Sequence, residues 1–532
     1  MSSRGAGAIL SVFALVCVAA LPATGQSFRV QCPTSTITHP VAGNNNSEPA
    51  YSGPTVQSLG AGGYLTPTAN VNGAIKCQQI SGGDGYATMG DGTQTYTFSF
   101  GPLSGLADIA NGLPGTQFPS GFNAVAPGAL VSGDPATTVG PPTGSYPSVY
   151  GLGAFTYNGA VGLTPDLDGI ASGACTSPCL NGHVDPRPIM DVGVMNGNIP
   201  APLMAIDEDD EYFLTLTNVG QIMRPDLFEQ HTVHFHGYPN ASAFYDGVPD
   251  ASVAINIGGS FTYYYLAPDA GSYFYHCHIT PPEHLQMGMV GQLYVRPRQN
   301  RVASGTSLFA ALQAQQGDPR TACNSSDVVC TNPLPAVNTG AVGGGKYAYN
   351  DGDGTTAYDV EYPLQIHGFD PNFHFVGMTF NPEGFADMKD KYFLLNGRSY
   401  PDTVTPGPLA TVSADGTNHF AQPLSSIITI PHGGKALLRI SDLDVTEYQT
   451  LASLGIPMKV IGANAKLLRD QAGNNMYYTT NSITLAGGES LDVILDSTGV
   501  PTGTYYLYTP NLDHLSNDAE NFGGLMTEVH VL

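Results

Sequence analysis

Short runs that alternate apolar and polar residues, separated by turns rich in glycine and proline, make up most of the chain. Tyr212 to Thr217 is one such run, and "SSIITIPHGGKALLRISD" contains two more. An alternation with a period of two residues is typical of β-strands with one face buried. The best candidate helix is short, "SLFAALQAQQ" at 307–316. The pattern therefore predicts an all-β protein with many short strands.

The strand pattern occurs twice. "HTVHFHG", which ends at Gly237, and "GSYFYHCH", which starts at Gly271, correspond to "IPMKVIG", which ends at Gly462, and "GTYYLYTP", which starts at Gly503. The two copies lie roughly 225 to 232 residues apart, which indicates a duplicated β-domain of the Greek-key sandwich or barrel type. We expect an N-terminal extension at 26–90, a first domain at 91–298 with an insertion at 104–188, a linker at 299–357 and a second domain at 358–532.

The first 25 residues have the composition of a secretory signal, with Arg4 ahead of an apolar run and small residues before Gln26. No other apolar run approaches the roughly 20 residues that span a bilayer. We therefore expect an exported protein without a membrane span. The formal net charge of -25 makes nucleic acid an unfavourable partner, and fits either a cationic substrate or simple solubility.

Seven cysteines follow the predicted signal, and six of them form local pairs that suit disulfides in an oxidising compartment. The pairs expected from proximity alone are Cys32 with Cys77, Cys175 with Cys179, and Cys323 with Cys330. Cys277 is left over, between two histidines. A lone thiol in this position indicates chemistry rather than a disulfide.

Strand alternation sorts the residues around Cys277 into two groups, because successive side chains point to opposite faces of a strand. His231 and Cys277 fall on one face. The other face carries four histidines: His234, His236, His276 and His278. One stretch of backbone can therefore serve two sites, one on each side of a sheet.

The first group gains two members from "HCHITPPEHLQMGM", since His284 and Met289 follow Cys277 closely. Two imidazoles, a thiolate and a weak axial thioether form the ligand set of a blue-copper electron-transfer site. Met287 competes with Met289 for the axial position, and the spacing favours Met289. A structural zinc site is the alternative, but zinc has no use for a weak axial methionine.

"HTVHFHG" together with "HCHITPPEHLQMGM" resembles the copper signature of the multicopper oxidases, and the layout is similar to two-domain laccases and copper nitrite reductases. The resemblance implies two cupredoxin-like domains and copper as the cofactor. The type 1 copper ligands that it implies are His231, Cys277, His284 and Met289. It also implies that His234, His236, His276 and His278 are half of a trinuclear copper cluster that reduces dioxygen.

The second repeat departs from this family pattern. It has Ile456, Lys459 and Ile461 at the positions of the first repeat's histidines, and Tyr508, Thr509 and Pro510 opposite His276, Cys277 and His278. The family's cluster needs eight histidines, and the motifs supply four. The second domain therefore resembles a cupredoxin without its metal. A homo-oligomer or a partner cupredoxin chain is one source of the missing ligands.

Four further features have alternative interpretations. The resemblance implies that Asp246 delivers protons near the cluster, although a turn-forming role before Gly247 fits equally. Glu283 either tunes His284 or faces solvent. The acidic run from Asp207 to Glu211 is expected to be a solvated turn, with attraction of Mn²⁺ or Fe²⁺ near the site as the alternative. The remaining histidines show no ligand spacing to one another. His514 is the strongest exception, because it lies near the second repeat's equivalent of the segment from His276 to Met289.

Taken together, the sequence predicts an exported copper oxidoreductase of the multicopper oxidase type. Its type 1 copper would take single electrons from a phenol or a metal ion. Cys277, with His276 and His278 on either side, would pass them to a histidine-bound cluster that reduces dioxygen. The alternative is a non-catalytic copper protein with a type 1 site only, or one subunit of a split oxidase.

Overall fold

The computed structural model describes residues 30–60, 62–123, 163–165, 173, 180–184, 195–224, 229–238, 242–267, 269–318, 323, 330–378, 384–412 and 418–532. The expected signal at 1–25 and the expected Cys175–Cys179 pair lie outside these residues. Within the described part, strands dominate and no helix is longer than eight residues, which confirms the all-β prediction. None of the described helices has the length and apolar character that a bilayer crossing requires.

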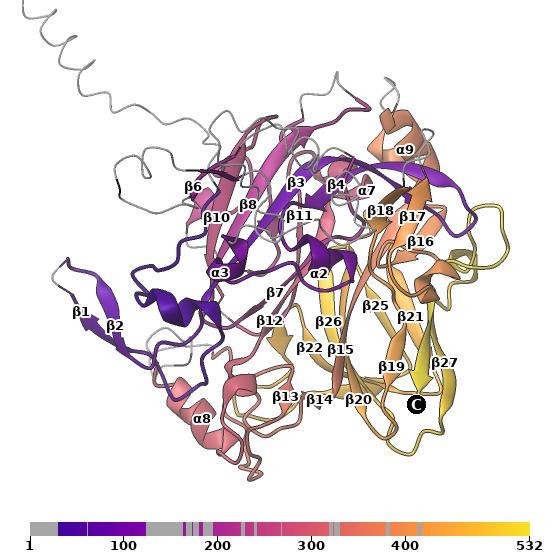
Figure 1. Ribbon diagram of the computed structural model, residues 1–532. Coiled ribbons are helices and arrows are strands. Elements are labelled where there is room, and N and C mark those ends of the chain that lie inside the picture. Colours follow the sequence, from indigo (N-terminus) through magenta and orange to yellow (C-terminus); the bar gives the residue numbers. More distant parts are fainter. Residues whose placement is uncertain are drawn as a thin grey trace, which may run out of the picture.

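The first sandwich has two four-stranded sheets (Figure 1). One has the order β10 (Ser260–Leu266), β8 (Glu211–Gly220), β3 (Ile75–Thr88) and β4 (Gln94–Pro102). The other has the order β7 (Ala201–Asp207), β12 (Val290–Arg296), β11 (Gly271–His276) and β9 (His234–Phe235). Its apolar core includes Cys277, which connects the packing of the domain directly to the candidate site.

β3 lies within the segment expected as an N-terminal extension, yet it is a central strand, parallel to β8 and antiparallel to β4. The first domain therefore starts N-terminally of the expected boundary at residue 91. The sequence of β3, "IKCQQISGGDGYAT", does not alternate, because nearly all of its residues are buried. A strand covered on both faces carries no period-two signal.

The second sandwich has a seven-stranded sheet and a five-stranded sheet with their own apolar core (Figure 1). The larger sheet contains β16 (Tyr392–Leu395), β15 (Val360–Phe369), β20 (Lys435–Asp442), β26 (Glu489–Asp496), β22 (Met458–Ala463), β23 (Lys466–Leu467) and β24 (Tyr478–Thr480). The smaller one contains β19 (Ile428–Ile430), β28 (Met526–Val531), β27 (Gly503–Tyr508), β21 (Gln449–Leu454) and β25 (Ser482–Leu485).

Four small two-stranded sheets complete the strand inventory of the described residues: β1 (Val56–Leu59) with β2 (Leu65–Ala69), β5 (Leu163–Pro165) with β6 (Leu180–Val184), β13 (Lys346–Tyr347) with β14 (Ala357–Tyr358), and β17 (Leu409–Val412) with β18 (Asn418–Gln422). The described α-helices are α2 (Leu106–Ala110), α3 (Pro119–Phe122), α7 (Pro281–Gln286), α8 (Leu308–Gln315) and α9 (Pro371–Met378). The described 3-10 helices are η1 (Ala42–Asn46), η2 (Ala243–Tyr245), η3 (Arg298–Arg301), η4 (Phe385–Asp387), η5 (Asp402–Val404) and η6 (Leu512–His514).

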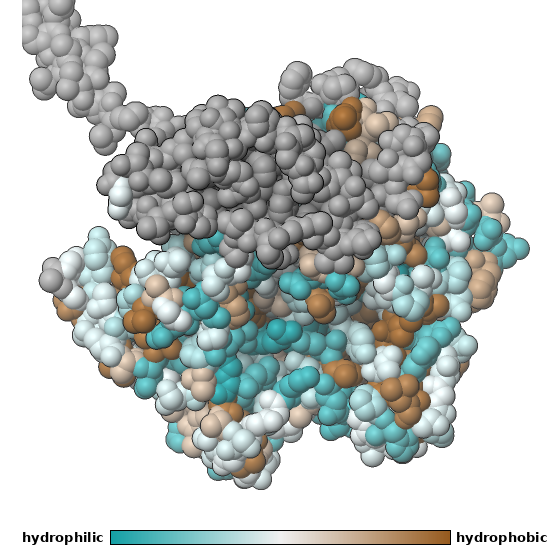
Figure 2. Space-filling view, viewed as in Figure 1, coloured by the Kyte–Doolittle hydropathy of each residue, from teal (hydrophilic) through white to brown (hydrophobic). Residues whose placement is uncertain are grey.

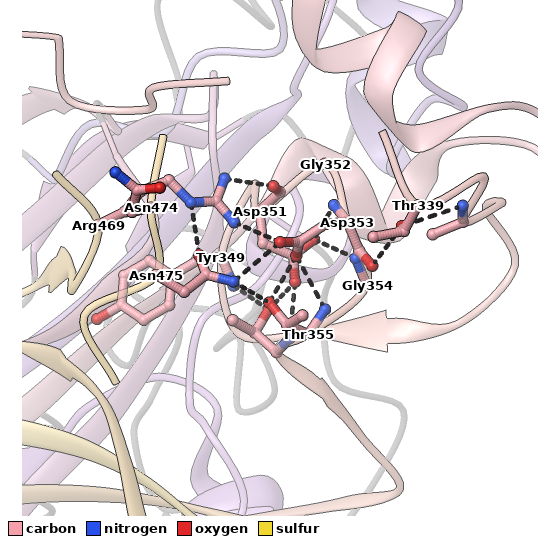
Figure 3. Close-up of polar contacts among 12 residues, drawn as sticks. Thr339, Tyr349, Asp351, Gly352, Asp353, Gly354, Thr355, Arg469, Asn474 and Asn475 are labelled. Carbon is pink, nitrogen blue, oxygen red and sulfur yellow. Dashed lines mark hydrogen bonds and ion pairs between the residues drawn. The ribbon is translucent and has the colours of Figure 1, made fainter. Parts of the chain in front are cut away.

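The segment between the sandwiches is folded against the second one. α8 matches the predicted helix, and Ser307 caps it by accepting a hydrogen bond from the amide of Ala310. Asp351 accepts hydrogen bonds from Thr356, and Asp353 pairs with Arg469 at 2.9 Å, as Figure 3 shows for Asp353 and Arg469. The oxygens of these carboxylates are therefore occupied by the chain itself.

Two of the three expected disulfides are present, Cys32–Cys77 and Cys323–Cys330. The first links the N-terminal segment to β3, and the second closes a small loop after α8. Both expectations are confirmed.

The acidic run between β7 and β8 forms the expected turn, but the expected solvation is wrong, since all five residues are buried. Arg298 donates two hydrogen bonds to Asp209, at 2.5 and 2.8 Å, and His39 contacts Glu211 at 2.7 Å. These partners lie far away in the sequence. The burial of the run therefore follows from long-range pairing rather than from local composition.

The described surface is otherwise mixed. On the face shown in Figure 2, hydrophobic residues are scattered among hydrophilic ones. Scattered apolar residues of this kind are ordinary on a protein surface and do not mark a binding site.

Candidate metal centres

The two metal groups are built on opposite sides of one strand pair. β9 pairs with β11 so that His234 lies opposite His276. His231, just before β9, forms an isolated bridge with Ile255. The described histidines and cysteine that could hold a metal then sort into His231 with Cys277 and His284, and His234 with His236 and His276. This division is the one that strand alternation predicts.

In the first group, three ligand atoms converge in the fully buried interior. The Nδ1 atom of His284 lies 3.2 Å from the Sγ atom of Cys277, and the Nδ1 atom of His231 lies 3.9 Å from it. The amide of Thr232 also donates to this sulfur at 3.4 Å. Cys277 is the free cysteine of the described residues.

The loop that returns from Cys277 is closed by backbone hydrogen bonds. The amide of Met289 donates to the carbonyl of His284 at 2.9 Å, and the amide of Cys277 donates to the carbonyl of Met289 at 3.2 Å. Met287 is equally buried, but its carbonyl accepts from Phe98 on β4. The backbone thus connects Met289, rather than Met287, to two of the three converging residues, which favours Met289 as the axial ligand.

The electrostatics of the first group favour a thiolate. Burial alone would raise the pKa of the Cys277 thiol, but the neighbouring His284 and His231 lower it well below its usual value. Burial would likewise lower the pKa of His284, but the Cys277 thiolate and Glu229 raise it to about 9. The thiolate is the form that binds metals.

In the second group, the imidazoles are held neutral. Burial lowers the pKa of His236 to about 4 and that of His276 to about 3. Their Nε2 atoms lie 2.9 Å apart. The Nδ1 atom of His234 lies 2.7 Å from the carbonyl oxygen of Asp246, and the Nδ1 atom of His276 lies 2.8 Å from the carbonyl oxygen of Cys277. Neutral imidazoles anchored in this way are ready to bind a metal.

His278 and Asp246 lie at the edge of this group. His278 is half-buried, and its ring packs on His234 at 5.0 Å between centroids, but it does not share the convergent position. Asp246 places Oδ2 3.6 Å from the Nδ1 atom of His234 and also ends the η2 turn. Both interpretations of Asp246 therefore remain open.

These geometries agree with the comparison with known proteins. Residues 181–300 match a family model described as multicopper oxidase. The chain carries a multicopper oxidase domain. Copper is the cofactor that this family implies.

The relatives of the multicopper oxidase domain match over a limited length. The laccase abr2 of Aspergillus fumigatus is 34% identical over 109 residues, 20% of this chain and 17% of that protein. A copper-containing nitrite reductase of Rhizobium meliloti is 35% identical over 109 residues, 20% of this chain and 26% of that protein. The match thus spans about a sixth to a quarter of these relatives. The crystal structure of a blue copper oxidase from Nitrosomonas europaea aligns with a TM-score of 0.43 and 22% identity over 63% of this chain and 78% of that chain.

The first group fits a type 1 copper ion. It offers one thiolate and two imidazole nitrogens within 4.8 Å of one another, in a buried apolar setting. The Nδ1 atoms of both imidazoles face the sulfur of Cys277. A soft sulfur with two imidazoles suits a copper ion that changes oxidation state.

The second group of the multicopper oxidase domain opens into a pocket of about 400 Å³ between the two sandwiches. His236 and His276 form one side. The second sandwich provides the other side, from two segments, 443–448 and 486–488. No histidine stands on that side among the described residues, so the described part of the chain does not supply the ligands of a complete trinuclear cluster.

The loop that follows Cys277 and carries His284 and Met289 is also held by residues that the sequence did not identify. The carbonyl of Gln286 accepts a hydrogen bond from His374 at 2.9 Å and lies 3.5 Å from the Nε2 atom of His367. The side chain of Gln286 donates to Asp390 at 2.9 Å. His367 and His374 are therefore buried, hydrogen-bonded core residues, in keeping with their lack of ligand spacing in the sequence. Nothing in their sequence spacing points to Gln286.

Proposed function

We propose that this protein is an exported copper-dependent oxidoreductase of the multicopper oxidase type. It takes single electrons from a reductant at the type 1 site of Cys277 and passes them to the histidine site on the other side of the strand, where dioxygen is reduced. One observation carries the proposal: the converging thiolate and imidazoles of the first group are joined to the second group through adjacent residues, Cys277 and His276.

The connection between the two groups is short. His276 directly precedes Cys277 in the chain, and its Nδ1 atom is hydrogen-bonded to the Cys277 carbonyl. Bound copper would supply the one-electron chemistry. The chain itself buries the Cys277 thiolate and excludes water from the first group. It also holds the imidazoles of His234 and His276 through their contacts with backbone carbonyls.

The reductant would approach at His284. Glu229 places Oε2 3.6 Å from the Nε2 atom of His284, and its side chain is 27% exposed. Glu283, next to His284, carries a second carboxyl group whose burial raises its pKa. A carboxylate at this position can attract a metal ion such as Mn²⁺, Fe²⁺ or Cu⁺, or accept a hydrogen bond from a phenol, so both reductant classes stay open.

The second sandwich favours an alternative function, because its described residues contain no group of three metal-binding side chains. The protein would then be an electron carrier with a type 1 site only, or one subunit of an oxidase that a partner chain completes.

The decisive experiment is spectroscopy of the copper-loaded full-length protein, followed by oxygen uptake with a phenolic dye and with Mn²⁺. An absorption band near 600 nm that disappears in Cys277→Ser, together with oxygen uptake, supports the oxidase. The band without oxygen uptake supports the carrier. A colourless copper-loaded protein, or a Cys277→Ser variant that keeps its band, contradicts both.

A paired substitution tests where electrons enter. Glu229→Gln should slow Mn²⁺ oxidation about tenfold or more if the carboxylate binds the cation, while leaving the blue band in place. Glu520→Gln, on an exposed residue away from the pocket, is the matched control and should change neither. Equal rates in the two variants would remove Glu229 from the path.

A further inference from the structure

The pocket between the sandwiches determines how many metal ions the second group can hold. Two segments of the second sandwich, 443–448 and 486–488, line the pocket opposite His236 and His276, and neither contains a histidine. Gly488 lies against the histidines, because a Cβ atom built on it would lie 3.5 Å from the ring of His236. Backbone therefore occupies the space beside the second group.

We infer that the second group is a mononuclear centre, in which His234, His236 and His276 hold one copper ion with an open side facing the pocket. The inference rests on the proposed function, and it replaces the trinuclear cluster that the family resemblance implies.

The three imidazoles have the arrangement that one ion needs. Their ligand atoms all lie within 4.8 Å of one another. Each ring is anchored through the backbone: His234 on Asp246, His276 on Cys277, and His236 on Gly488. Two nitrogens at about 2.0 Å from one ion and at right angles to each other lie about 2.8 Å apart. The Nε2 atoms of His236 and His276 are 2.9 Å apart.

His514 of the second sandwich does not complete a cluster. His514, the nearest candidate from the sequence, is buried and stacked on Phe393 at 3.7 Å between ring centroids. Its Nδ1 atom lies 3.0 Å from Gln449, and its Nε2 atom lies 3.0 Å from Glu447. His514 therefore supports the pocket wall from behind and does not reach the metal group.

The carboxylates of the wall are also engaged. Asp444, which is 4% exposed, accepts hydrogen bonds from the amides of Thr446 and Glu447 and from the side chain of Gln449. Glu447 is held by His514. Since both oxygens of Asp444 and the Oε2 atom of Glu447 already have partners, the coordination side that faces the wall is left for a small ligand. A pocket of about 400 Å³ has room for one.

The test is a copper count with electron paramagnetic resonance on the reconstituted full-length protein. If the second group is mononuclear, we expect about two copper ions per chain, one blue and one not blue. Both should be visible by electron paramagnetic resonance. Azide, used as a probe, should shift only the signal of the non-blue ion. Four ions per chain, one ion per chain, or a pair that is silent in the spectrum would overturn the inference. This measurement needs only the wild-type protein.

Three variants localise the second ion. His236→Ala should lower the count to about one and keep the band near 600 nm. His278→Ala should keep about two ions, whereas a site built from all four histidines would lose copper. His432→Ala, on an exposed histidine of the second sandwich, is the control and should keep both. A His236→Ala protein that keeps two ions, or a His278→Ala protein that keeps one, contradicts the inference.

The two proposals fail differently. If the protein has no blue band or takes up no oxygen, the proposed oxidase fails whatever the count. If it takes up oxygen but holds four ions, the oxidase stands and the mononuclear centre fails.

Discussion

The side-chain amide of Gln286 donates a hydrogen bond of 2.9 Å to Oδ1 of Asp390, across the boundary between the two β-sandwiches. Gln286 belongs to α7, two residues after His284, and Asp390 precedes β16 of the second sandwich. Although the second sandwich provides no side chain to the first metal group, it holds the loop on which that group is built. The loss of metal-binding residues from a domain therefore does not make that domain dispensable.

Gln286→Ala should destabilise the protein by about 1–3 kcal/mol, because buried partners lose their hydrogen bonds. The amide of Asp370, which donates to the Gln286 side chain at 3.2 Å, would be one of them. Denaturant unfolding measures the loss. Gln313→Ala, on an exposed position of α8, should change the stability by less than about 0.5 kcal/mol. Because Gln286 is not part of the first metal group, the band near 600 nm should survive in this variant. Loss of the band would instead show that Gln286 shapes the metal group itself.

Gly82 on β3 leaves room for the ring of His231. A Cβ atom built on Gly82 would lie 2.6 Å from Cδ2 of that ring, closer than atoms pack. Gly82→Ala should therefore displace a candidate type 1 ligand, weaken or shift the band near 600 nm, and cost about 1–3 kcal/mol of stability by overpacking. The measurement is the absorbance per copper ion at fixed loading.

Gly43→Ala provides the comparison, since nothing lies within 4 Å of a Cβ atom built there. It should leave the spectrum unchanged. If Gly82→Ala also gave the wild-type spectrum, His231 would have to move freely, which its complete burial argues against.

The candidate metal groups could be predicted from the sequence because their residues are close together along the chain. Alternation along "HTVHFHG" and "HCH" assigns each side chain to a face, and the structure places His231 and Cys277 apart from His234, His236 and His276 accordingly. The local disulfide Cys323–Cys330 and the short helix α8 were predictable for the same reason.

The features that the sequence did not reveal depend on residues far apart in the chain. β3 is covered on both faces and so shows no alternation. The acidic run at Asp207 to Glu211 has the composition of a solvated turn, and only the pairing of Asp209 with Arg298 explains its burial. The anchoring of Gln286 by the second sandwich likewise leaves no pattern along the sequence.

Glu361 connects the two sandwiches through charge. Its carboxylate contacts Arg296 of the first sandwich at 2.7 Å and Arg439 of the second at 3.0 Å. Burial would raise its pKa, but the two guanidinium groups lower it to about 2 from an ordinary value of 4.5. A lowered pKa means that the contribution to stability is present above pH 4.5 and is lost as the pH falls toward 2.

Glu361→Gln should therefore cost about 3 kcal/mol of unfolding free energy at pH 7, and the deficit should shrink as the pH drops below 4.5. Unfolding curves of wild type and variant between pH 7 and the lowest pH at which both fold measure this difference. Glu520→Gln, on an exposed residue, should show no such pH dependence. A deficit that stayed constant with pH would assign the effect to packing instead of charge.

The two described disulfides close loops of very different length, and this difference predicts unequal losses. Cys32 and Cys77 are 45 residues apart, whereas Cys323 and Cys330 are 7 apart. Closing a loop removes entropy from the unfolded chain, by about 4 kcal/mol for the longer loop and about 2.4 kcal/mol for the shorter one. Replacing both cysteines of the first pair by alanine should therefore destabilise the protein more than the same change in the second pair.

Because Cys77 lies on β3, between β8 and β4, its replacement also affects the sheet opposite β9 and β11. The blue band should nevertheless persist in both double variants at temperatures where they are folded, since neither disulfide contacts the thiolate of Cys277. Thermal unfolding with and without a reducing agent separates the loss of the disulfide from the change of side chain on β3. The reducing agent should lower the melting temperature of the wild type toward that of the variants with both cysteines of a pair replaced. An equal loss from the two pairs would mean that structure remaining in the unfolded chain, rather than loop length, sets the contribution of the longer bridge.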